Sequence, residues 1–362
     1  MAKKTFDEVV LFARTGLNPR NNFKLGNGDN KYITIKNIHD GELVIDDNTD
    51  VVSDEAINLI HKRSQIKKGD ILFCSIGRIG DMYIIENEPE GWDINESVFA
   101  FTLNSDIIYQ KYFYYIFKNQ NTIRLISKNS SGSTFKSIKM NQIKKMVFEL
   151  PPLEEQKKVI NILDNLSLII KNFEKELKKL DELTKARFVE MFGALTDTVP
   201  LSHYIKALTA GKSLPGEEEC RNKVLKTGAA TYDYFDETQV KNLPVDYTPL
   251  AEHQIHDGDV IISRMNTAEL VGATAYIWKA PDNTYLPDRL WRAELKEKVN
   301  PIFVWQVIIQ SSTKEAIRRI AGGTSGSMKN ISKPGLLGVN VIKVSLDQQN
   351  QFAAFVSQTD KS

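Results

Sequence analysis

The sequence predicts an α+β protein in which two similar α/β modules are joined by one long helix. Two observations lead to this prediction: an uninterrupted helical segment in the middle of the chain, and a set of features that recurs on both sides of it. The chain has 362 residues, which is enough for two or three domains with cores of their own. Its hydrophobic fraction of 41% and charged fraction of 26% are typical of folded globular proteins.

The helical segment runs from Leu153 to Phe192 and contains neither glycine nor proline. Pro151 and Pro152 precede it, and Gly193 is well placed to end it. Its apolar residues alternate steps of four and three, which is the heptad seam of a coiled coil. A helix of this length would measure roughly 60 Å, more than a globular domain needs. We therefore predict a coiled-coil spacer, with a core-facing helix as the alternative. The residues expected to face a partner helix are Leu163, Leu166, Ile170, Phe173, Leu177 and Leu180.

The segments on either side of the helix resemble two copies of one module. The stretch KKGDILF recurs as HDGDVII, and the loop and helix start SSGSTFKSIK…LPPLEEQ recurs as GGTSGSMKNIS…VSLDQQ. Four identical pairs share an offset of 193 residues (331 − 138): Lys136/Lys329, Ile138/Ile331, Leu153/Leu346 and Gln156/Gln349. An internal duplication explains this agreement better than chance does.

The order of these features predicts four parts. The modules occupy residues 1–150 and 196–344, the long helix occupies 151–195, and a second helix starts at 345–362. The second helix begins with the same pattern as the spacer, but the sequence ends at Ser362, where the first copy continues. We therefore expect a shortened copy of the spacer helix there.

Composition limits the classes of partner. Lys and Arg total 47 against 46 Asp and Glu, a net charge of +1, so a nucleic acid would have to be bound by local clusters. The two cysteines, Cys74 and Cys220, are too few for a disulfide scaffold and fit a reducing compartment. No stretch approaches the roughly 18 apolar residues of a membrane span. We expect a cytoplasmic protein without a membrane partner.

Motifs for catalysis are weak or missing. The sequence has neither the Gly-x4-Gly-Lys-Ser/Thr loop of nucleotide-binding proteins nor the Asn-Pro-Pro-aromatic motif of adenine methyltransferases. Asp282, Glu294 and Lys296 have the form of a PD-ExK nuclease motif, which could hold Mg²⁺, but so short a pattern often arises by chance. His253 and His256 lack a third zinc ligand. We predict no catalytic or metal site, and keep a Mg²⁺-dependent sequence-specific nuclease as an alternative.

The segments LPPLEEQKKVINILDNL and KELKKLDELTKARFVEMFG closely resemble the conserved helical region of the specificity (S) subunit of type I restriction-modification systems. The Gly-Asp strand starts and the loops GSTFKSIK and TSGSMKNIS are similar to its target recognition domains. The resemblance implies that each module reads one half of a bipartite, asymmetric site on double-stranded DNA. It also implies that the helices form an antiparallel pair, which fixes the gap between the half-sites and docks the methyltransferase subunits.

The same resemblance implies a subunit that is not itself an enzyme and binds no cofactor. S-adenosylmethionine would be held by the methyltransferase subunits, and ATP and Mg²⁺ would be used by the restriction subunits. Because the distal helix is missing from the pattern, self-association through the unpaired long helix is a further possibility. A coiled-coil scaffold without a DNA role is the remaining alternative.

The resemblance directs attention to the polar loops as DNA contacts. Small hydroxyl residues and exposed backbone N–H groups near lysines suit phosphate oxygens, whereas Arg and Asn side chains suit base edges. The candidate phosphate contacts are Lys128, Ser133, Thr134, Lys136 and Lys139, and in the second module Ser325, Ser327 and Lys329. The candidate base readers are Lys36, Asn37, Arg78, Lys226, Thr227, Arg264, Asn266 and Arg289. A solvated structural turn is the alternative for each of these loops.

Overall fold

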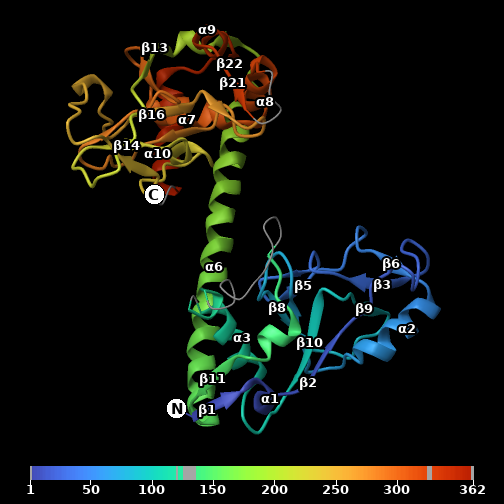
Figure 1. Ribbon diagram of the computed structural model, residues 1–362. Coiled ribbons are helices and arrows are strands. Elements are labelled where there is room, and N and C mark those ends of the chain that lie inside the picture. The colour runs from blue at the N-terminus through green and yellow to red at the C-terminus, as the bar shows by residue number, and fades with distance from the viewer. Residues whose placement is uncertain (1, 120, 125–135, 324–327, 360–362) are drawn as a thin grey trace. The chain divides into compact units, whose positions relative to one another are not determined.

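The structure is a computed structural model that describes residues 2–119, 121–124, 136–323 and 328–359. The chain divides into two compact units, Met1–Asn172 and Phe173–Ser362, which we call unit 1 and unit 2. Their boundary falls inside α6 (Leu153–Phe192), the long green helix of Figure 1. Each unit is described by itself.

Unit 1 is built on a four-stranded antiparallel sheet with the strand order β2-β10-β7-β8. These strands are β2 (Val10–Thr15), β10 (Val98–Leu103), β7 (Ile71–Cys74) and β8 (Met82–Ile84). A three-stranded sheet, β6-β3-β9, contains the parallel pair of β3 and β9, and the unit's first and last strands, β1 and β11, pair with each other. Their bounds are β6 (Val51–Val52), β3 (Asn30–Ile33), β9 (Trp92–Ile94), β1 (Ala2–Thr5) and β11 (Val147–Leu150), beside a hairpin of β4 (Ile38–His39) and β5 (Glu42–Leu43).

The core of unit 1 lies on both faces of strand β10, because neighbouring residues of a strand point to opposite faces. Phe99 and Phe101 enter an aromatic cluster, while Val98 and Ala100 enter a smaller aliphatic one on the other face. Phe113, on α3 (Gln110–Lys118), contacts Phe101 with ring centroids 6.2 Å apart. Further helices of the unit include α1 (Phe6–Val9), α2 (Asp54–Ser64) and α5 (Met140–Ile143).

Unit 2 repeats this plan. Its four-stranded sheet has the order β13-β20-β16-β18, and its three-stranded sheet β15-β14-β19 again contains one parallel pair, β14 with β19. The strands are β13 (Ile205–Ala210), β20 (Leu290–Leu295), β16 (Val260–Ser263), β18 (Thr274–Tyr276), β15 (Val240–Asn242), β14 (Lys223–Leu225) and β19 (Thr284–Tyr285), with the pairs β12 (Thr198–Pro200)/β22 (Asn340–Ile342) and β17 (Met265–Asn266)/β21 (Lys329–Asn330). The helices are α7 (Pro301–Ile309), α8 (Ser311–Ile320), α9 (Lys333–Leu337) and α10 (Leu346–Thr359), with short 3-10 turns η1 (Leu201–His203), η2 (Thr227–Ala230) and η3 (Ala251–His253).

The repeat extends to single hydrogen bonds. Gly69 and Gly258 both have φ of +87°, a conformation that glycine adopts without the strain of a side chain. Each glycine N–H donates a hydrogen bond of 2.8 Å to the carbonyl of the isoleucine that directly follows the neighbouring strand, Ile85 after β8 and Ile277 after β18. These turns aim the following strands, β7 and β16, into the two sheets. The predicted fold class, two similar α/β modules with a long helix between them, is confirmed.

Helix α6 begins and ends at the predicted residues, Leu153 and Phe192. Gln156 in its first turn is fully buried: its Oε1 accepts from the N–H of Tyr109, and its Nε2 donates to the carbonyls of Ile107 and Pro151. Gln349, at the start of α10, makes the matching bonds with the N–H of Asn300 and the carbonyl of Val344. Both modules are therefore joined to a helix start by the same buried glutamine.

A second contact fastens α6 to unit 1. Asp164 accepts hydrogen bonds from Lys111 Nζ at 2.6 Å and from the Tyr115 hydroxyl at 2.7 Å, and both donors lie on α3. Burial, together with the bond to the Asp164 carboxylate, raises the pKa of Tyr115 to about 12. The hydroxyl therefore stays protonated at neutral pH and remains a donor to the helix.

The end of α6 packs against α10 within unit 2. The ring of Phe352 lies 5.4 Å from those of Phe188 and Phe192, and Thr359, seven residues further along α10, meets Thr184, which lies earlier in α6. The two helices therefore run antiparallel. Along the middle of α6 the predicted seam lies open: Leu166, Ile170, Phe173 and Leu177 are 47–59% exposed, and Leu163 and Leu180 are half-buried. In the parts of the chain that the structure describes, no helix is both long and apolar enough to cross a membrane.

Candidate nucleic-acid interface

In unit 1 the predicted contact residues lie on loops that are bonded to one another. The Arg78 guanidinium donates from Nη2 to the carbonyls of Ile35 (3.0 Å) and Ile38 (3.2 Å), which ties the loop after β7 to the loop after β3. The N–H of Gly77 donates to the carbonyl of Lys136 at 3.1 Å, which adds the stretch before α5. The fold thus gathers three loops that carry four of the predicted cations, all of them exposed: Lys36, Arg78, Lys136 and Lys139.

Arg78 is anchored on one side and open on the other. Its Nε pairs with Asp81 at 3.0 Å, and its Nη2 also lies 3.2 Å from His39 Nε2, yet half of the side chain remains exposed. An arginine held in this way loses little rotamer freedom when it binds, and guanidinium groups bond bidentately to guanine edges. The Arg-x-x-Asp spacing in GRIGD was the available signal for this pair, and our sequence reasoning missed it.

Asn37 lies in the same loop but faces inward. It is 8% exposed, its Oδ1 accepts from the N–H of Thr34, and its Nδ2 donates to the carbonyl of Val44 and the hydroxyl of Thr49. A base edge could gain this amide only if the loop gave up those bonds, at a cost of about 1 kcal/mol or more each. We therefore assign Asn37 to the stability of the loop and leave it out of the interface.

Unit 2 gathers the equivalent loops. The N–H of Arg264 donates to the carbonyl of Arg289 at 3.0 Å, and the Arg264 carbonyl accepts from Ile331 at 3.0 Å. Strand β17 pairs with β21, which sets Asn266 opposite Lys329. Lys226, Thr227 and Arg289 line one hollow of about 430 Å³. These loops follow β14 and β16 and precede β20 and α9. The corresponding elements of unit 1 are β3 and β7, and β10 and α5.

The basic side chains of unit 2 differ in how far they are exposed. Lys226 and Arg289 are exposed, whereas Arg264 is half-buried with its guanidinium carbon 5.7 Å from the centre of the Trp291 ring. The buried Nε of Arg264 has no hydrogen-bond partner within the described structure. Lys329 is half-buried and its Nζ lies 3.4 Å from the carbonyl of Gly323. The predicted contacts Lys128, Ser133, Thr134, Ser325 and Ser327 lie outside the described residues.

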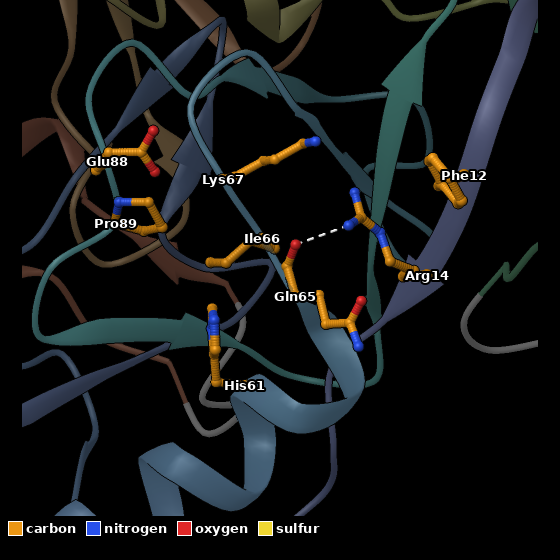
Figure 2. A pocket seen from close by; sticks show the side chains of 8 residues that line it. All are labelled: Phe12, Arg14, His61, Gln65, Ile66, Lys67, Glu88 and Pro89. Atoms are coloured by element: carbon orange, nitrogen blue, oxygen red, sulfur yellow. Dashed lines mark hydrogen bonds between the residues drawn. The ribbon is translucent and has the colours of Figure 1, made fainter.

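A larger hollow of unit 1, about 570 Å³, is lined by none of the predicted contact residues (Figure 2). It is lined by Gln65 and Lys67, which precede β7, whereas Arg78 follows the other end of that strand. Arg14 reaches its rim, where it donates to the Gln65 carbonyl and pairs with the fully buried Asp70 at 2.7 Å. The charge of Arg14 is thus already paired with that of Asp70.

The carboxylates of the nuclease alternative lie on or beside strands of two different sheets. Glu294 on β20 accepts a hydrogen bond from the Thr209 hydroxyl, and Asp282 lies in the turn before β19. Among the described residues, no group of three or more His, Cys, Asp and Glu side chains is arranged to hold a metal ion.

Comparisons with known proteins show which family the sequence resembles. The family model described as the type I restriction modification DNA specificity domain matches residues 1–183. The EcoKI specificity subunit of Escherichia coli K12 is 23% identical over 254 residues, which cover 64% of this chain and 54% of that protein. The MjaIX specificity subunit of Methanocaldococcus jannaschii is 28% identical over 125 residues, 34% of this chain and 28% of that protein. The matches thus span about half the length of these relatives or less.

The fold itself has a counterpart among solved structures. The crystal structure of the type I restriction-modification S subunit from M. genitalium superposes with a TM-score of 0.55, covering 99% of this chain and 89% of that one at 15% identity. The family model covers half of the 362 residues. The chain therefore belongs to the family of type I restriction-modification DNA specificity subunits.

Proposed function

We propose that this chain reads a bipartite, asymmetric site on double-stranded DNA, with unit 1 on one half-site and unit 2 on the other. The observation that carries the proposal is the recurrence of one loop arrangement: each unit presents basic residues on loops after its equivalent strands, bonded to each other through the backbone. A feature needed only for folding would recur as well, but it would not require exposed Lys and Arg side chains in both copies.

The two units differ in the side chains on this shared frame. Unit 1 offers Lys36 and Arg78, whereas unit 2 offers Lys226, Thr227, Arg264, Asn266 and Arg289. Because discrimination between bases depends on which donors and acceptors meet the groove, two different sets imply two different half-sites. The exposed lysines, Lys136 and Lys139 among them, suit phosphates, which position the protein without reading sequence.

Helix α6 supports the second part of the proposal, that the helix fixes the gap and docks methyltransferase subunits. It is one continuous helix of 40 residues, and the exposed seam that includes Leu166 and Phe173 is the kind of surface that packs against another helix. We assign that surface to the methyltransferase subunits, which would bring S-adenosylmethionine. Restriction subunits would bring ATP and Mg²⁺. The cytoplasm is the compartment where such a complex meets DNA, and pairing with a second copy of the chain is the competing use of the seam.

The test is selection from random double-stranded DNA by the full chain co-expressed with the methyltransferase subunit of the same system, followed by sequencing of the bound pool. Two different short motifs at one fixed gap are expected. A single motif or a palindrome would contradict the asymmetric reading and point to a paired second copy. No enrichment, with binding unaffected by salt, would favour a scaffold, since phosphate contacts make affinity fall with salt.

Two lysines of unit 1 give a matched test of the interface. Lys136→Gln removes a cation from the loop cluster and should reduce the slope of log affinity against log salt by about one. Lys157→Gln, at an exposed position of α6, removes the same charge outside the loops and should leave the slope unchanged. Equal slopes for the two variants would remove Lys136 from the interface.

A further inference from the structure

An ion pair outside the predicted contacts recurs in both units. Asp40 lies between β3 and β6 and Asp233 between β14 and β15, and both have positive φ, 46° and 67°. Each carboxylate pairs with a lysine from the helical part of its own unit: Lys118 at 3.1 Å from Asp40, and Lys314 at Asp233. Aspartate tolerates the left-handed conformation better than most residues do, but still at some cost. The recurrence of an unfavoured backbone state together with its ion pair indicates a shared task.

In unit 1 the lysine holds two loops of the candidate interface. Lys118, the last residue of α3, reaches Asp40 in the turn between β4 and β5, a hairpin that directly follows the loop carrying Lys36. Its Nζ also lies 3.9 Å from Asp81, the carboxylate that anchors Arg78. Burial by itself would lower the pKa of Lys118, but the hydrogen bond to Asp40 and the nearby charges outweigh burial and raise it. Lys118 therefore carries its charge at neutral pH.

In unit 2, helix α8 holds the corresponding loops. Lys314 pairs with Asp233, whose Oδ1 accepts from the N–H of Thr274 at 3.1 Å, and both partners of the ion pair are less than a quarter exposed. One turn further along α8, Arg318 donates to the carbonyl of Glu269 at 2.8 Å, in the loop that follows Asn266. In both units, therefore, basic side chains on helices reach two regions of loops. One region follows β3 in unit 1 and β14 in unit 2, and the other follows β7 in unit 1 and β16 in unit 2.

We propose that Lys118 and Lys314 are positioning residues that hold the recognition loops of their own unit in the geometry that reads DNA, without touching DNA themselves. This inference rests on the proposed function. The reasoning is that hydrogen bonds to base edges tolerate misplacements of only about 0.5 Å, and loops hold such a geometry only when supporting side chains fix them. The half-buried state of both lysines, 34% and 17% exposed, suits support and not contact.

The experiment compares variants on one helix. Lys118→Met keeps the length of the side chain and removes its charge; Lys111→Met does the same on α3, but breaks the pair with Asp164 of α6 and not a pair with a loop. With the full chain and its methyltransferase partner, Lys118→Met should lose about fivefold in discrimination between correct and mismatched bases in one half-site only, as for loss of one ion pair. Lys111→Met should leave both half-sites unchanged, and Lys118→Arg should restore discrimination. Lys314→Met should affect the other half-site alone.

Further measurements separate support from other roles. The salt slope of binding should be unchanged in Lys118→Met; a slope reduced by about one would show a direct phosphate contact and overturn the inference. Unchanged discrimination, or an equal loss at both half-sites, would also overturn it. If Lys118→Met lowers the thermal midpoint, its loss of discrimination could come from unfolding, and Lys118→Arg is then the deciding variant. If Lys118→Arg is folded but does not restore discrimination, the inference is wrong. If the unmodified chain selects no bipartite site, the proposed function itself fails, and that result is distinct from all of these.

Discussion

The buried glutamine at the start of α10 allows a quantitative prediction. In Gln349→Met the side chain keeps its length but loses the amide that bonds the N–H of Asn300 at 3.0 Å and the carbonyl of Val344 at 2.8 Å. Gln349 is only 3% exposed, so water does not readily replace these bonds. Two bonds at about 1 kcal/mol each, plus the penalty for leaving buried backbone groups unpaired, give a loss of about 2–4 kcal/mol. For a unit of this size that corresponds to a fall in melting temperature of roughly 5–12 °C.

Calorimetry is the assay, because two units can unfold in separate transitions and a single midpoint would then not be defined. Tryptophan fluorescence of a Trp92→Phe background assigns the transition of unit 2, because Trp278, Trp291 and Trp305 lie in that unit and Trp92 lies in unit 1. Gln351→Met, at an exposed position of α10, is the control and should change the stability by no more than about 0.5 kcal/mol. A loss below about 1 kcal/mol for Gln349→Met, or equal effects of the two variants, would refute the reasoning.

Three further predictions concern unit 1 and the long helix. Hydrogen bonds from Thr5 and Lys4 lower the pKa of Glu8 to about 2, below its ordinary value of 4.5. The carboxylate therefore stabilises unit 1 above pH 4.5, and this contribution is lost as the pH falls toward 2. Glu8→Gln should flatten the dependence of stability on pH in this range, and an unchanged acid unfolding curve would contradict the prediction. Leu166→Glu or Phe173→Glu should weaken methyltransferase binding by about tenfold or more, because a charge would be buried in the seam, while the circular dichroism stays native; survival of binding in both would refute the docking role. Seven residues inserted after position 172 should lengthen α6 by about 10 Å while keeping nearly the same rotation about the helix axis. DNA selection should then show a gap between the half-sites that is wider by about three base pairs, with both half-site sequences unchanged.

The long helix and the duplication were predictable because their signals are local. A segment without Gly or Pro and with regular apolar spacing has few alternatives to a helix, and the structure places its ends at Leu153 and Phe192. Likewise, Gly69 and Gly258 signal a positive φ that few other residues adopt easily, and this fixes equivalent turns in sequences that otherwise differ.

The candidate interface was less predictable, because it depends on which side of a loop a polar residue faces. Lys36 and Asn37 are neighbours in sequence, yet Lys36 is exposed, whereas the buried side-chain amide of Asn37 is hydrogen-bonded to Thr34, Val44 and Thr49. Nothing in a single sequence distinguishes an asparagine that closes a turn from one that reads a base. The pair of Lys118 and Asp40 spans 78 residues and could not be seen before the fold brought them together.

The pairing of each unit's first strand with its last has an evolutionary consequence. Because β1 lies beside β11, and β12 beside β22, the chain enters and leaves a module at the same place. Homologous recombination within the flanking helix starts would therefore exchange a whole module while its core and its junction glutamine remain intact. We expect natural variants of this protein to differ by entire modules, so that half of the target sequence is replaced in one genetic event and the other half is inherited unchanged.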